Sequence, residues 1–124
     1  MTTAQLCLLV ACLLPVSCAW VAKAGAFGLK DNHDPRAWLA RQDGWRARAN
    51  AAQANGFEAL PLFIAGLFVA HQHQAPQATV DMLALAFVAA RVAYIGLYLA
   101  DWAALRSVAW VAAVAAALGL FFAG

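Results

Sequence analysis

The sequence predicts an all-α integral membrane protein, a single domain over residues 1–124 built as a bundle of four transmembrane helices. Hydrophobic residues make up 65% of the chain and charged residues only 11%, whereas charged residues are about a quarter of an ordinary soluble domain. Four apolar runs, at about 5–27, 45–72, 79–101 and 105–123, are each long enough to cross a bilayer, which takes about 20 residues. We therefore expect membrane lipids around the chain and no nucleic-acid partner.

The first apolar run has no charged side chain before Lys23. A cleaved signal peptide is the alternative to a retained helix. Signal peptides have basic residues before the apolar stretch, and here basic residues only follow it. We expect a retained helix that is kinked at Pro15, which neighbouring helices can accommodate. Its three cysteines, Cys7, Cys12 and Cys18, match no metal or redox spacing and are interpreted as small packing residues.

The segment after this run, from Lys23 to Gly44, contains Asp34 followed by Pro35. This pair is typical of an N-cap and a first helical position. A short interfacial helix over 35–43 would place Trp38 at the membrane surface, and an ordered loop is the alternative. His71 and His73, at the end of the second run, lack a nearby third ligand, so no metal site is predicted.

The second apolar run is the unusual one, because it begins with arginines and carries polar residues before it turns wholly apolar. At about 100° per residue, Arg48, Asn55 and Glu58 fall on one helical stripe about 80° wide. The stripe could be a helix–helix contact without a ligand. Glu58 favours a functional site instead, because an ionisable residue at membrane depth is costly.

The third apolar run carries Arg91 at its centre, where a lone arginine costs about 2.5–3.5 kcal/mol on insertion scales. It should therefore face the bundle and have a partner. Counting residues from the shared end of an antiparallel pair puts Glu58 and Arg91 at similar depths, so we predict a buried Glu58–Arg91 ion pair. Tyr94, Tyr98 and Asp101 share Arg91's face and predict a polar track that leads to the end of the bundle.

The fourth run begins at Arg106 and Ser107 and is rich in small residues that permit close helix packing. Six of the eight Lys and Arg residues lie between positions 23 and 48, and Arg106 lies in the third loop. By the positive-inside rule, the first and third loops are cytoplasmic and both termini are non-cytoplasmic. The polar track then opens toward the cytoplasm and suits a small, multiply charged polar ligand.

Three short motifs resemble a known family. They are Asn55-x-x-Glu58-x-x-Pro61-x-Phe63 preceded by Arg48, then Arg91-Val-Ala-Tyr94-x-x-x-Tyr98, and finally Arg106-Ser107. In this order, they are similar to bacterial-type members of MAPEG, the membrane-associated proteins in eicosanoid and glutathione metabolism. The resemblance implies a homotrimer that binds glutathione as a cosubstrate between adjacent subunits, near the cytoplasmic side. We expect the bacterial inner membrane as its location.

The resemblance also implies a role for each matching residue. Arg106 would be catalytic and would stabilise the glutathione thiolate. The residues that would bind glutathione are Arg48, Asn55, Glu58, Tyr94, Tyr98 and Ser107. One departure is that Ala51, Ala52 and Ala54 occupy the region where glutathione-using members carry a further arginine.

These observations support three hypotheses about function. The first is a membrane-bound transferase or peroxidase-like enzyme that activates the glutathione thiolate against a lipophilic small-molecule electrophile. The second is a non-catalytic membrane protein of the same fold with another ligand or none. The third is a small membrane transporter, although the first run lacks the carboxylate that a proton-coupled one would need there.

Overall fold

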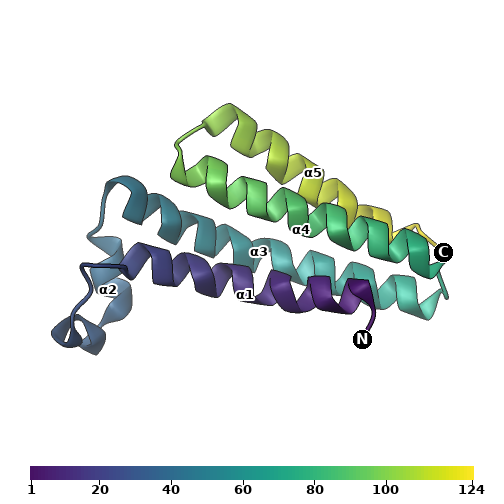
Figure 1. Ribbon diagram of the computed structural model, residues 1–124, viewed down its shortest axis with the longest axis horizontal. Coiled ribbons are helices and arrows are strands. Elements are labelled where there is room, and N and C mark those ends of the chain that lie inside the picture. The colour runs from purple at the N-terminus through teal and green to yellow at the C-terminus, as the bar shows by residue number, and fades with distance from the viewer.

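The computed structural model describes all 124 residues and is entirely helical (Figure 1). Its elements are α1 (Thr3–Lys23), the 3-10 helix η1 (Leu29–His33), α2 (Pro35–Ala40), α3 (Gly44–Gln72), α4 (Gln77–Leu99) and α5 (Ala103–Phe121). Four of them, α1, α3, α4 and α5, are long and apolar enough to cross a membrane. This confirms the predicted four-helix membrane bundle.

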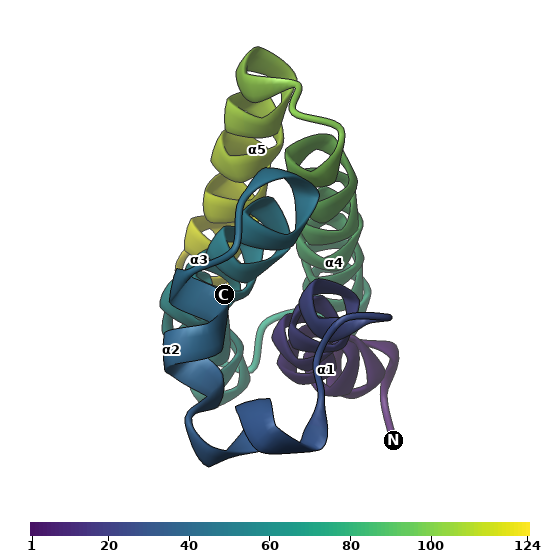
Figure 2. The same ribbon diagram turned by 90° about the vertical axis from the view of Figure 1, so that its left-hand side faces the viewer.

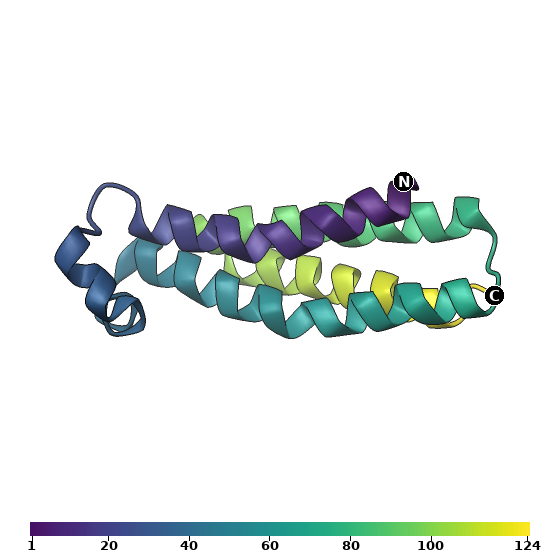
Figure 3. The same ribbon diagram turned by 90° about the horizontal axis from the view of Figure 1, so that it is seen from below.

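The long helices run side by side, and the short α2 lies at one end of them (Figures 1 and 2). Both chain termini lie at the opposite end, as Figure 3 also shows. The loop from η1 to α2 and the turn between α4 and α5 therefore share one end of the bundle. The turn between α3 and α4 lies at the end with the termini.

The ends of α1 follow from local chemistry. Thr2 and Gln5 form a capping box, in which the Gln5 amide donates to Thr2 Oγ1 at 3.1 Å and the Thr2 amide to Gln5 Oε1 at 2.8 Å. The helix ends at Lys23, earlier than the predicted residue 27, because Gly25 turns the chain with φ +78°. Pro15 lies inside α1 and has no N–H to donate to the Ala11 carbonyl.

The segment between α1 and α3, for which an ordered loop was the alternative, contains the short helix α2. Asp34 Oδ1 accepts a hydrogen bond from the Ala37 amide at 3.2 Å, so Asp34 is the N-cap of α2 with Pro35 at its first position. Trp38 was expected at the membrane surface, and that expectation was wrong. Its side chain is buried and packs edge-on against Phe27, with the ring centroids 5.1 Å apart.

The core is filled by aromatic and small side chains. Phe63 of α3 and Phe87 of α4 are both buried and stack with ring centroids 4.0 Å apart. Where α3 meets α5, a Cβ on Gly66 would lie 2.8 Å from the backbone oxygen of Ala117. Only glycine allows so close an approach, so small residues position α5 against α3.

Candidate functional site

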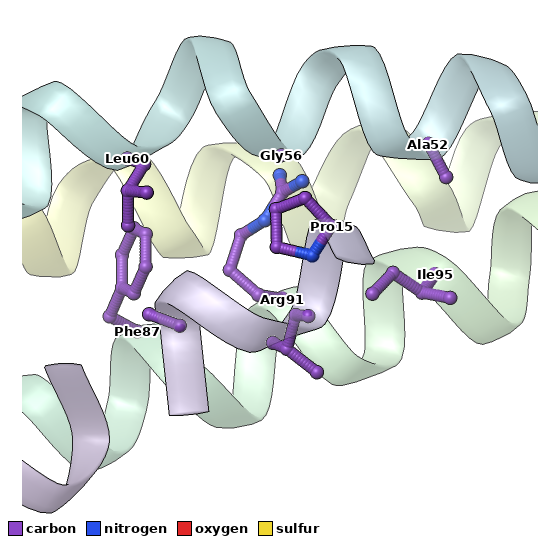
Figure 4. A pocket seen from close by; sticks show the side chains of 9 residues that line it. Pro15, Ala52, Gly56, Leu60, Phe87, Arg91 and Ile95 are labelled. Carbon is purple, nitrogen blue, oxygen red and sulfur yellow. The ribbon is translucent and has the colours of Figure 1, made fainter. Parts of the chain in front are cut away.

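Arg91 lies at the middle of α4, inside the bundle, and is only 3% exposed. Its Nη1 donates a hydrogen bond to Asn55 Oδ1 of α3 at 2.8 Å, and its Cζ lies 4.2 Å from the ring centroid of Tyr94. Figure 4 shows the guanidinium beside Pro15 and Gly56. Its other terminal nitrogen, Nη2, is buried there without a hydrogen-bond partner.

The predicted Glu58–Arg91 ion pair is wrong for this chain. Arg91 uses Asn55 instead, and Glu58 is exposed on the surface of α3. The two candidate partners differ by three residues, which turns the side chain by about 60° around the helix axis and displaces it by about 4.5 Å. Depth alone therefore could not distinguish the amide from the carboxylate.

A pocket of about 420 Å³ lies between α4 and α5. Its lining residues are Tyr94, Tyr98, Arg106, Ser107, Trp110 and Val111. The structure thus brings together four residues that the sequence proposed for the site. The sequence reasoning missed Trp110 and Val111. Trp110 lies one helical turn beyond Arg106 and Ser107, so helical spacing could have placed it on the same face.

Cationic and aromatic groups form a continuous series of contacts from mid-bundle to this pocket. The hydrogen bond from Arg91 to Asn55 and the contact of Arg91 with Tyr94 begin the series. The rings of Tyr94 and Tyr98 then meet edge-on with centroids 5.6 Å apart, and Arg106 Cζ lies 4.3 Å from the ring centroid of Tyr98. Cation–π contacts of this kind are each worth about 0.5–2 kcal/mol, more when they are desolvated.

Asp101 does not join this series. It was expected on the same face as Arg91, but it lies in the turn after α4 with φ +62° and is exposed. Asn55 and Glu58 are also outside the pocket lining, because they belong to α3. Among the predicted site residues of α3, only Asn55 connects to the track, through Arg91.

Two arginines at the start of α3 cap the ends of other helices. Arg48 donates from Nε and Nη2 to the Leu99 carbonyl of α4 at 3.3 and 3.2 Å. Arg46 donates from Nη1 to the Ala22 carbonyl of α1 at 2.9 Å and lies over the Trp45 ring. Carbonyls in the last turn of a helix lack intrahelical donors and attract cations. These two side chains therefore tie α1, α3 and α4 together at the α2 end.

Arg106 has a different environment from these arginines. Its guanidinium rests on the Tyr98 ring and makes no hydrogen bond or ion pair within the chain. Ser107 is exposed beside it, and its hydroxyl donates to the Ala103 carbonyl at 3.2 Å. All five N–H donors of Arg106 are thus available to a ligand.

Comparison with known protein families identifies the family of the chain. The model of the MAPEG family matches residues 3–124, which is nearly the whole chain. No match was found among curated proteins or among solved structures. The four apolar helices support an integral membrane protein, and the matched family is one of glutathione and eicosanoid metabolism. The chain belongs to the MAPEG family.

Proposed function

We propose that the chain is a membrane-bound transferase or peroxidase-like enzyme that activates the thiol of glutathione against a lipophilic electrophile. The observation that carries this proposal is the position of Arg106. It lines an open pocket, its donors are unoccupied, and the Tyr98 ring orients its guanidinium. Arg46 and Arg48, at the start of α3, cap other helices, and Arg91 is buried.

Arg106 would act on the acid–base equilibrium of the thiol. A free thiol has a pKa of about 8.5, and an adjacent cation lowers it because it favours the charged thiolate. The proton goes to solvent. The thiolate sulfur then forms a bond to the electrophilic carbon, and the leaving group departs with the electron pair of the broken bond. With a hydroperoxide as electrophile, the sulfur would attack an oxygen, the O–O bond would break, and an alcohol would leave after taking up a proton. A second glutathione would then react with the resulting sulfenic acid to give the disulfide and water.

The remaining site residues would bind and orient glutathione. Tyr94, Tyr98 and Ser107 offer hydroxyl groups around the pocket. Asn55 and Glu58 would hold the peptide-like part and the amino group. Arg48 uses Nε and Nη2 for capping, which leaves Nη1 for one of the carboxylates of glutathione. A planar guanidinium suits that contact.

The proposed assembly is a homotrimer with glutathione bound between adjacent subunits. Glu58 supports self-association, because it is exposed on a membrane-spanning helix and a carboxylate facing lipid would be costly. A neighbouring copy would cover it and complete the site with residues of α3. The lipophilic substrate would enter from the surrounding lipid, and the pocket would open on the cytoplasmic side of a bacterial inner membrane.

Replacement of Arg106 tests this function. Arg106→Leu should lower kcat with glutathione and a reactive aryl halide by at least tenfold and change the KM for glutathione less, because it removes the charge beside the sulfur. Arg41→Leu is the matched control, since Arg41 is an exposed arginine outside the pocket. Equal activity of the two variants would contradict the role of Arg106.

The non-catalytic alternative also has an observation in its favour. Arg46, Arg48 and Arg91 all have structural contacts within the chain, and alanines occupy positions 51, 52 and 54. A protein of this family without turnover would retain those contacts for stability alone. It would then show no aryl-halide activity in the unmodified chain, whatever the state of Arg106.

A further inference from the structure

A second pocket lies at the end of the bundle that carries both termini. Its volume is about 440 Å³, within the range of about 300–1,000 Å³ that is usual for small-molecule sites. Its walls are the start of α1, the last turns of α3, the turn that follows and the start of α4. It shares no residue with the pocket around Arg106. The proposed chemistry therefore leaves it without a role.

The polarity of this pocket changes along its length. Four large side chains form its apolar part: Leu8, Ile64, Leu67 and Phe68. The polar lining residues are Thr2, Gln5, His71, Gln74 and Gln77, and they all lie at or beyond helix ends. From His71 back to Ile64 the helix rises about 10 Å. The polar rim is thus at the membrane surface and the apolar part extends into the hydrocarbon region, which is the profile of an amphiphile.

The charges around the rim favour a zwitterion. No Lys, Arg, Asp or Glu lines the pocket, but Asp81 lies beside its rim, where Oδ1 accepts hydrogen bonds from the Ala4 amide at 2.9 Å and from Gln77 Nε2 at 2.8 Å. This carboxylate would repel an anionic head group and attract an ammonium group. The last turn of α3 is also at this end of the bundle, and helix C-termini carry partial negative charge. An ammonium group would therefore lie near Asp81 and the last carbonyls of α3, and a phosphate would contact the side-chain donors of His71 and Gln74.

The rim also argues against a second copy of the chain as the occupant. The side chains of His71 and Gln74 are exposed and make no hydrogen bond within the chain. An apolar helix from a neighbouring copy would bury these groups without partners, and each unpaired buried polar group costs about 1–3 kcal/mol. A head group offers acceptors and donors to both. We propose that this pocket binds one zwitterionic phospholipid, with an acyl chain between α1 and α3.

The test is to count bound lipid after reconstitution. The full chain is reconstituted in an equal mixture of phosphatidylethanolamine and phosphatidylglycerol, extracted in mild detergent and analysed by native mass spectrometry. We expect about one phosphatidylethanolamine per chain to remain and the phosphatidylglycerol to be lost. Ile64→Trp should fill the apolar part and abolish retention. Leu13→Trp is the control, because Leu13 is an exposed leucine of α1 outside the pocket.

A second pair of variants tests the head-group contact without changing the core. His71→Leu should reduce retention at least severalfold, whereas His73→Leu, an exposed histidine outside the lining, should not. No retained lipid, or equal loss in both histidine variants, would overturn the proposal. So would a retained fatty acid or phosphatidylglycerol in place of the zwitterion. A change in oligomer mass on Ile64→Trp without any bound lipid would assign the pocket to a neighbouring copy instead.

Discussion

At the residue scale, the buried side chain of Arg91 determines which polar groups the middle of the bundle contains. Its charge is in a region where solvation is poor, and the chain provides an amide, an aromatic ring and no carboxylate. A void of about 10 Å³ beside Pro15 and Gly56 adjoins the guanidinium, near the lower limit for one water molecule. The sequence could show that Arg91 needs a partner. It could not choose Asn55 over Glu58, because that choice depends on side-chain direction within a single helical turn.

A double-mutant cycle tests the Asn55–Arg91 contact. Asn55→Leu should destabilise the bundle by about 1.5–3 kcal/mol, because it removes the hydrogen bond of a buried charged donor. Adding Arg91→Leu should recover part of that loss, so that the two single effects do not add. Unfolding in detergent, followed by circular dichroism, measures each term. In the parallel cycle of Glu58→Gln with Arg91→Leu, the two effects on stability should add. Strong coupling between them would instead be evidence for a Glu58–Arg91 ion pair, which the structure lacks.

At the element scale, helix positions were predictable and helix contacts were only partly so. Apolar runs and turn residues located the four spans, and Asp34 with Pro35 marked the start of α2. The capping roles of Arg46 and Arg48 could not be predicted from the sequence, because their partners are backbone carbonyls, which every residue has. The burial of Trp38 was hidden for a similar reason, since it depends on Phe27 returning across the loop.

The close approach of α3 to α5 gives a prediction at this scale. Gly66→Ala should destabilise the protein by about 1–3 kcal/mol, because the new methyl group would lie 2.8 Å from the Ala117 oxygen. Gly96→Ala is the matched control in α4, where no atom lies within 4 Å of the added Cβ. It should be neutral or stabilising by up to about 1 kcal/mol. Equal melting temperatures of the two variants would show that the helices are not packed this closely.

At the scale of the whole molecule, the chain has two ends with different chemistry. Basic residues, the helix caps and the Arg106 pocket lie at the α2 end, and the uncharged pocket lies at the end with the termini. Charge bias and helix count predicted this polarity. The sequence did not reveal either pocket as a shape, because each depends on how helices pack against one another. The pocket near the termini joins α1 to α3 and α4, which are far from α1 in the chain, and the Arg106 pocket lies between the consecutive helices α4 and α5.

The orientation of these ends in the membrane is the next prediction. The basic first loop should be cytoplasmic and both termini exported. An alkaline phosphatase fusion at Gly124 should therefore be active in bacterial cells, since that enzyme needs an oxidising compartment for its disulfides. A fluorescent reporter that matures only in the cytoplasm should be dark at the same position. The reverse pattern would place the Arg106 pocket on the other side of the membrane.

The central claim is that Arg106 turns bound glutathione into a thiolate, and ultraviolet absorbance of the thiolate measures this directly. Titration of the purified protein with glutathione at neutral pH should produce a saturable thiolate signal. Arg106→Leu should nearly abolish that signal, because loss of the positive charge raises the pKa of the thiol. Arg41→Leu should retain it. A wild-type protein that shows no thiolate signal at saturating glutathione would contradict the account and favour the non-catalytic alternative.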